Sequence, residues 1–286
     1  MAVRPIGARQ ADFTRFHGHL MAVPLHGPTA LDSSIRSFYQ DTLRLLNDKQ
    51  QSYLVGGAYA LERYTGVERQ TKDLDIFIRR GDRGSLCDLL DRAGYQTEVT
   101  HPHWLAKAFR QENYIDIIFG SGNGLCPVDE DWFQFSVPDK VFDVPILLCP
   151  VEEMVWSKSF IMERERFDGA DVAHLLKARG RALDWTRLLE RFAEYWPVLL
   201  AHLVLFRFIY PDETDTMPEP VFGELLQRAS QWPRGPDNRT CRGTFLSREQ
   251  YLTDILKWGY RDSRLAPQGN LTAEDIRHWT AAIYDR

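Results

Sequence analysis

Two aspartates on one predicted strand are the residues in this sequence best suited to chemistry. The segment at 71–78 reads TKDLDIFI. Because alternate side chains of a strand point to the same side, Asp73 and Asp75 share one face, and the apolar residues between and after them share the other. Two carboxylates so close repel each other unless something positive lies between them. Magnesium takes hard oxygen ligands of this kind, so the spacing predicts a divalent cation site that is open to phosphate oxygens.

A third aspartate lies in a second predicted strand, YIDII at 114–118. A lone charge inside an apolar strand is costly unless it is paired or bound to a metal, which singles out Asp116. If this strand lies beside the first, the three carboxylates converge. Three such groups can hold two metal ions about 4 Å apart, the arrangement used for phosphoryl and nucleotidyl transfer. The alternative is that the aspartates face water at an edge, or pair with Arg69 and Lys72.

A glycine pair precedes the aspartates in the chain. Gly56 and Gly57 lie between a predicted strand at 52–55 and a predicted helix at 58–64. Glycines let backbone N–H groups approach a phosphate closely, and the N-terminus of the following helix favours an anion. Taken on its own, the pair would be explained better by a plain tight turn. The glycines and the aspartates in this order are more specific than either feature alone.

The elements that must position these residues alternate between helix and strand up to Pro150 and are helical after it. The apolar spacing predicts helices at 33–47, 58–64 and 85–93 and strands at 52–55, 72–78, 95–99, 106–110, 114–119 and 144–148. Beyond Pro150 it predicts helices at 151–165, 169–178, 184–195, 198–210, 250–260 and 272–284. We therefore expect an N-terminal arm (1–33), a mixed α/β domain (34–150) and a helical domain with an irregular tail (151–286).

Composition and charge exclude several classes of protein. The chain has 286 residues, 44% of them hydrophobic and 26% charged, which excludes a disordered chain, a collagen-like repeat and a disulfide miniprotein. A net charge of −5 argues against a strongly basic nucleic-acid coat. It leaves room for a local basic face, such as the stretch at 177–191, which is either an RNA-docking surface or a solvated helix face.

The cysteines and the apolar runs predict where the protein works. The four cysteines form no C-x-x-C pair, which is typical of free thiols in a reducing compartment. No apolar run near the N-terminus is long enough for a secretion signal. The apolar stretch at 198–210 is short for a membrane span, which needs about 20 residues, so we expect a buried helix there. These features predict a cytoplasmic protein without a membrane partner.

Together the motifs resemble those of a known superfamily. The run LVGGAYA at 54–60, then Gly66 and the pattern R-x-T-x-D-x-D from Arg69 are similar to the DNA polymerase β-type nucleotidyltransferases. More narrowly they resemble the minimal and abortive-infection toxin-type nucleotidyltransferases of bacteria. Asp116 fits the third carboxylate of that pattern, and Lys158 and RERFDGAD at 164–171 resemble its lysine and charged helical signature. The resemblance covers residues 34–210.

The resemblance implies a fold and an activity. The expected fold is a mixed sheet with flanking helices, followed by a helical C-terminal domain. The expected activity is Mg²⁺- or Mn²⁺-dependent transfer of a nucleoside monophosphate from a nucleoside triphosphate to a hydroxyl of RNA, a protein or a small molecule. For a toxin-type member the acceptor would be a tRNA end, and a cognate antitoxin is implied.

The resemblance also implies roles for single residues. Asp73 and Asp75 would bind the metals, and Asp116 would bind the second metal and help to deprotonate the acceptor hydroxyl. Gly56 and Gly57 would hold the phosphates through their backbone N–H groups.

Two cations complete the implied set. Lys158 would contact the triphosphate, unless it is a solvated helix lysine. Arg69 would orient the aspartates or contact phosphate, unless it is a surface partner of Glu62 or Glu68. A competing function is a binding or regulatory module that kept the fold and lost the chemistry, against which the three intact aspartates argue.

Overall fold

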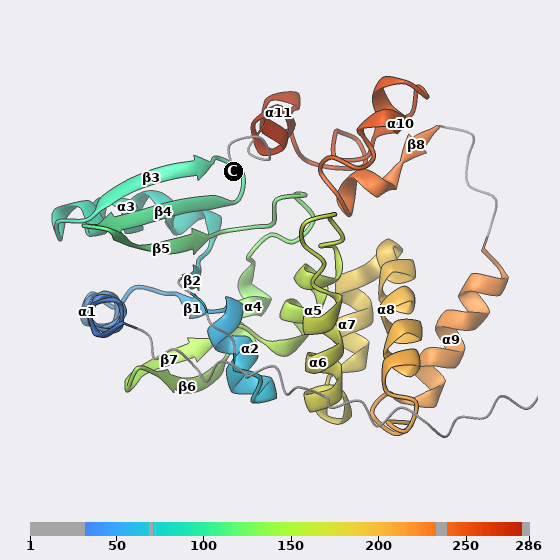
Figure 1. Cartoon of the computed structure of the whole chain (residues 1–286), viewed down its shortest axis with the longest axis horizontal. Helices are drawn as coiled ribbons and strands as arrows, with labels where there is room; N and C mark the ends of the chain where they lie inside the picture. The colour runs from blue at the N-terminus through green and yellow to red at the C-terminus, as the bar shows by residue number, and fades with distance from the viewer. Residues whose placement is uncertain (1–31, 69–70, 72, 233–238, 282–286) are drawn as a thin grey trace, which may run out of the picture. The chain divides into compact units, whose positions relative to one another are not determined.

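A seven-stranded mixed sheet organises the first half of the chain (Figure 1). The structure is a computed structural model that describes residues 32–68, 71, 73–232 and 239–281. In spatial order the strands are β3 (Gln96–His101), β4 (Leu105–Arg110), β5 (Asn113–Ile118), β2 (Leu74–Phe77), β1 (Leu54–Val55), β7 (Val144–Leu148) and β6 (Val137–Val141). The mixed α/β class predicted from the sequence is confirmed.

The pairing of β2 with β5 sets the geometry of the centre of the sheet. These two strands run parallel, and Asp75 is the register partner of Asp116. The strand β5 reaches this place through the antiparallel succession β3–β4–β5, in which Lys107 lies opposite Asp116. On its other side β2 pairs antiparallel with β1, and β1 pairs parallel with β7. Residues of the same face therefore form a row that crosses β2, β5 and β4.

Three of the four α-helices in the described residues of the first half agree closely with the predicted ones, and the shortest was not predicted. They are α1 (Ser33–Asp48), α2 (Gly57–Thr65), α3 (Arg83–Arg92) and the short α4 (Glu130–Gln134). Asp32 caps α1 by accepting a hydrogen bond from the Ser34 N–H, because the first N–H groups of a helix have no partner within it. Gly66 ends α2 in the left-handed conformation (φ 71°), a backbone state that glycine adopts without a steric penalty.

Helices dominate the second half of the chain. They are α5 (Val151–Ser159), α6 (Gly169–Arg179), α7 (Trp185–Phe192), α8 (Trp196–Ile209) and α9 (Glu219–Ser230). The predicted helix at 151–165 is too long, because the chain leaves α5 at Phe160 and forms a hairpin closed by a bridge between Met162 and Phe167. The helix α9 was not predicted. Contacts of α6 with both α2 and α5 join this half to the sheet half.

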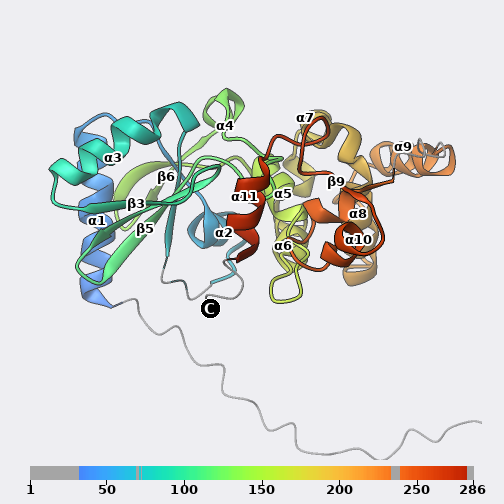
Figure 2. The same ribbon diagram turned by 90° about the horizontal axis from the view of Figure 1, so that it is seen from above.

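The last segment returns to the sheet. After β8 (Thr240–Cys241), α10 (Leu252–Leu256) and β9 (Arg261–Asp262), the chain forms α11 (Ala273–Ala281), which contacts β3 (Figure 2). The Trp279 ring lies so close to Gly122 that any side chain there would clash with it. The helix α10 is shorter than the predicted helix at 250–260.

One helical stretch has the length and composition of a membrane span. The α7–α8 stretch, Trp185–Ile209, is 25 residues long, with a mean hydropathy of 1.4 in its most apolar window. The prediction of a short buried helix is therefore only half right. Leu199, Leu203 and Phe206 are buried on one side of α8, while Phe208 on the other side is 83% exposed.

All described residues belong to one compact unit, Leu31–Arg286. The predicted arm at 1–33 lies almost wholly outside the described residues. The predicted division at Pro150 stays a prediction.

Candidate active site

Three aspartates meet on one face of the central strands. Asp75 and Asp116 are direct neighbours on β2 and β5, and Asp73 lies two residues before Asp75. Leu74 and Ile76, which point to the opposite face, are completely buried. The predicted division of this strand into an acidic and an apolar face is confirmed, and so is the expectation that the Asp116 strand lies beside it.

The carboxylates perturb one another. Burial, followed by the negative charge of Asp116, raises the pKa of Asp75 to about 7. Burial also raises the pKa of Asp116, although the Lys107 ammonium opposes this shift. A raised pKa in a cluster of like charges means that the site would gain free energy from a cation, and perturbed carboxylates of this kind are typical of functional sites.

Two further residues, Lys107 and Tyr114, belong to this cluster and were missed from the sequence. The Lys107 ammonium donates to Asp116 Oδ1 at 2.7 Å and lies 4.1 Å from the centre of the Tyr114 ring. The Tyr114 hydroxyl donates to Asp73 Oδ1, and this hydrogen bond is the first cause of the raised pKa of the tyrosine. The signal for both lay in the strand period, since positions 107 and 114 face the same side as Asp116 once the antiparallel register is known.

The glycine turn touches the aspartates directly. Gly57 has a φ of +56°, and a Cβ atom added there would lie 1.6 Å from Asp75 Oδ2. A Cβ atom added at Gly56 would lie 2.2 Å from the Phe77 ring. Each glycine is therefore required by a close approach, and at Gly57 what approaches is the Asp75 carboxylate.

The two glycines differ in what their N–H groups can do. The Gly56 N–H already donates to the backbone carbonyl of Asp75 at 3.0 Å, so it is not available to a phosphate, contrary to the prediction. The first hydrogen bond of α2 runs from the Ala60 N–H to the Gly56 carbonyl. The N–H groups of Gly57 to Tyr59 precede it, and no side chain caps them. These three groups can meet an anion at the helix N-terminus.

Lys158 is neither a solvated helix lysine nor an unpaired phosphate contact. Its ammonium donates to Asp168 Oδ2 at 2.9 Å and to Asp171 Oδ2 at 2.8 Å, and all three side chains are largely buried. The Arg166 guanidinium also binds Asp168 with two hydrogen bonds, at 2.8 and 2.9 Å. Lys158 thus joins the end of α5 to the start of α6.

The same two cations influence the acidic cluster. The charges of Lys158 and Arg166 lower the pKa of Asp75, against the larger effects of burial and of Asp116. Arg166 keeps 59% of its side chain exposed while it binds Asp168. The Asp75 charge in turn raises the pKa of Arg166, so the interaction between these two groups is mutual. Arg166 is the more accessible of the two to a bound anion.

The remaining predicted cations divide into two groups. Arg69 and Lys72 lie outside the described residues, so the role predicted for Arg69 stays a prediction. The basic stretch at 177–191 is largely neutralised. Arg187 and Arg191 both bind the fully buried Glu153, and Arg181 pairs with Asp215 at 2.6 Å. The solvated-face alternative is therefore wrong for Arg187 and Arg191, whose side chains are only 11% exposed, and RNA docking at this stretch stays a prediction.

The donor set suits a hard divalent cation, but its present arrangement does not form a ligand cage. Carboxylates are the oxygen ligands that Mg²⁺ prefers, and three of them lie on this face, of which Asp75 and Asp116 have raised pKa values. Within the described part of the chain, no three or more His, Cys, Asp or Glu side chains are grouped to hold a metal. Oxygens of Asp73 and Asp116 instead accept hydrogen bonds from Tyr114 and Lys107.

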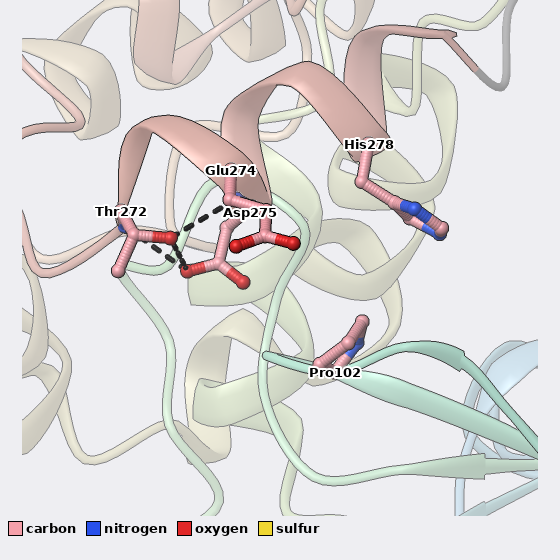
Figure 3. A pocket seen from close by; sticks show the side chains of 5 residues that line it. All are labelled: Pro102, Thr272, Glu274, Asp275 and His278. Atoms are coloured by element: carbon pink, nitrogen blue, oxygen red, sulfur yellow. Dashed lines mark hydrogen bonds between the residues drawn. The ribbon is translucent and has the colours of Figure 1, made fainter.

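A cavity of about 300 Å³ lies elsewhere, beside the turn between β3 and β4, where Pro102 faces α11 (Figure 3). Thr272 and Asp275 exchange hydrogen bonds at the start of α11, as the sequence pattern there predicts. The His103 Nε2–H donates to the backbone carbonyl of Gly122, in the loop after β5, at 3.0 Å. None of the cavity's lining residues belongs to the predicted site.

Comparisons with known proteins give weak structural likenesses. No family model and no curated protein matches the chain. A lincomycin-bound structure of the lincosamide antibiotic adenylyltransferase LnuA is 18% identical, with a TM-score of 0.35 over 49% of this chain and 94% of that one. The antibiotic-resistance factor ANT(2'')-Ia is 14% identical, with a TM-score of 0.36 over 70% and 100% of the two chains. An apo form of a tRNA-processing enzyme is 11% identical, with a TM-score of 0.30 over 90% and 76%. At this level of similarity, function must be argued from the site itself.

Proposed function

We propose that this protein is a divalent-cation-dependent nucleotidyltransferase, which moves a nucleoside monophosphate from a nucleoside triphosphate to an acceptor hydroxyl. The observation that carries the proposal is the pairing of Asp75 with Asp116 across parallel strands, with the Gly57 backbone against the Asp75 carboxylate. The acidic face attracts cations, and the free N–H groups at the start of α2 attract phosphate oxygens.

The aspartates would hold the cation. Asp73, Asp75 and Asp116 supply the oxygens, and a bound Mg²⁺ or Mn²⁺ supplies Lewis-acid stabilisation of the charge that develops on the α-phosphate. Tyr114 and Lys107 hold the carboxylates of Asp73 and Asp116 in place.

The backbone and side chains of the site account for the other steps. The N–H groups of Gly57 to Tyr59 would bind phosphate oxygens at the start of α2. Arg166 would meet the charge of the leaving pyrophosphate, since its side chain is exposed near Asp75. Asp116 would accept the proton of the acceptor hydroxyl, because a carboxylate with a raised pKa is a stronger base.

The acceptor defines the finer function. A tRNA end, a protein side chain and a small hydroxylated molecule all offer the required hydroxyl group. A toxin role with a cognate antitoxin is one form of this proposal, taken from the resemblance to the toxin-type nucleotidyltransferases. Growth arrest on expression, relieved by Asp75→Asn, would support it.

The proposal is tested by incubating the protein with each labelled nucleoside triphosphate and a cell extract. We expect label to enter one acceptor class and pyrophosphate to be released. Asp73→Asn and Asp75→Asn should abolish both signals while the far-UV circular dichroism spectrum is retained. Asp88→Asn, an exposed aspartate on α3, is the matched control and should behave as the wild type. Unchanged turnover in either site variant would refute the assignment, and absence of transfer to any acceptor would favour a binding or regulatory module.

A further inference from the structure

A lysine stands in the row of acidic residues that crosses the open face of the sheet. On three adjacent strands, β2, β5 and β4, the register places Asp75, Asp116 and Lys107 side by side. Lysine was not required here by the fold, because its neighbours on β4 that point to the core, Ala106 and Ala108, carry the packing. The Lys107 ammonium instead compensates the negative charge of the neighbouring carboxylates.

Two contacts hold Lys107 over the site. Its Nζ lies 2.7 Å from Asp116 Oδ1, and 4.1 Å from the centre of the Tyr114 ring, which binds cations through its π face. Tyr114 is itself fixed by the hydrogen bond from its hydroxyl to Asp73. The side chains of Lys107 and Asp116 are 23% and 17% exposed, so the pair is screened less than a surface ion pair.

An ammonium at this place competes with a metal ion. Asp116 is the carboxylate that a second divalent cation would need as a ligand, and its Oδ1 already accepts the Lys107 ammonium. Two positive centres on one carboxylate would repel each other, and the repulsion is strong where water is scarce. The lysine therefore supplies one unit of positive charge that a second metal ion would otherwise provide.

We infer that Lys107 acts as the resident cation of Asp116, so that the protein takes up one divalent cation through Asp73 and Asp75 rather than two. The inference rests on the proposed function and narrows it, since it leaves Asp73 and Asp75 as the metal ligands and gives Asp116 only the proton-accepting role. Lys107 is in this view a positioning residue. It fixes the Asp116 carboxylate for its proton-accepting role and does not itself contact the substrate.

The test counts bound metal ions and does not depend on turnover. The full-length protein is titrated with Mn²⁺, and free Mn²⁺ is followed by electron paramagnetic resonance. We expect one ion per chain for the wild type and two for Lys107→Met. Because Met leaves Asp116 without a partner and could weaken folding, Lys107→Gln serves as a second variant, since it retains a hydrogen-bond donor but no charge; it should also bind two. Circular dichroism verifies the fold of each.

Two control variants distinguish the effect of the positive charge at position 107 from other effects of substituting a lysine. Lys107→Arg keeps the positive charge and should bind one ion. Lys140→Met removes an exposed lysine from β6, at the far edge of the sheet, and should also bind one. Asp75→Asn should abolish Mn²⁺ binding at micromolar concentrations.

Each outcome decides the question. Two ions on the wild type, or one ion on both folded Lys107→Met and Lys107→Gln, would overturn the inference while leaving the proposed transfer reaction intact. No Mn²⁺ binding to any form would overturn the inference and the metal dependence together. The expected ion counts without transfer to any acceptor would uphold the role of Lys107 and refute the proposed function.

Discussion

Replacing Gly57 by alanine tests the site at its closest contact. The substitution has two separate effects. The first is backbone strain, because alanine at a φ of +56° is in the left-handed region, which costs about 1–2 kcal/mol. The second is a collision, since the new methyl group would lie 1.6 Å from Asp75 Oδ2. Relieving it displaces the carboxylate by about 2 Å, and a misplacement of even 1 Å can cost about 100-fold in rate.

Gly66→Ala separates these effects. Gly66 has a similar φ of +71°, but a Cβ atom added there has no atom within 4 Å. Both variants should lose about 1–2 kcal/mol of stability, which lowers Tm by roughly 2–8 °C for a chain of this size. The assay is kcat/KM for pyrophosphate release below both Tm values. We expect Gly57→Ala to lose at least about 100-fold, and Gly66→Ala to stay within about threefold of the wild type.

Equal activity of the two variants at equal folded fraction would contradict the role given to the contact between Gly57 and Asp75. Such a result would mean that the Asp75 carboxylate can move away from residue 57 without a loss of kcat/KM. The close approach would then be a packing detail, not part of the reactive arrangement.

Three other perturbations have defined outcomes. A folded-state pKa of about 7 for Asp75, above its ordinary 3.8, gives stability that is present at low pH and is lost as the pH rises through this window. Asp75→Asn should therefore raise Tm at pH 8 in metal-free buffer and leave it unchanged at pH 3. Lys158→Met should cost about 3–5 kcal/mol in denaturant unfolding, because it removes the cation that two buried carboxylates share, and Arg166 compensates only one of them, Asp168. The control is Lys177→Met, which removes an exposed lysine that pairs with Glu213 at 3.9 Å. It should lower the free energy of unfolding by less than about 1 kcal/mol. Asp116→Asn should lower kcat far more than it weakens nucleotide binding by calorimetry, and equal losses would contradict its role as the base.

Much of the fold could be predicted because local signals agree with the final structure. The strand at 144–148 and the end of α2 at Gly66 follow directly from apolar alternation and from glycine chemistry. The strand β6 was missed because its sequence, VPDKV, has little apolar alternation, and it exists only through its pairing with β7. The predicted helix at 151–165 overran because the charged run from Glu163 gives no stop signal. The hairpin there depends on ion pairs with Asp168 that come later in the chain.

The candidate site could be predicted only where a residue and its neighbours in the chain carry the signal. The aspartates and Gly57 stand out by spacing alone. Lys107 and Tyr114 could not be assigned, because their relevance depends on which strands are adjacent and in which register. Lys158 was predicted to contact the triphosphate. In the structure it binds two buried carboxylates that lie in another element, a pairing that the local sequence does not reveal.

The parallel pairing of β2 with β5 also has a consequence for the order of folding. Tyr114 bonds a residue 41 positions earlier, so the acidic row cannot exist while only β1 and β2 have been synthesised. The meander from β3 to β5 must form first and then dock edgewise, and closing such a long loop is slow. A nascent chain on the ribosome would thus complete the acidic row only once β5 has emerged and docked beside β2, before β6 and β7 have been synthesised and added to the other side of the sheet.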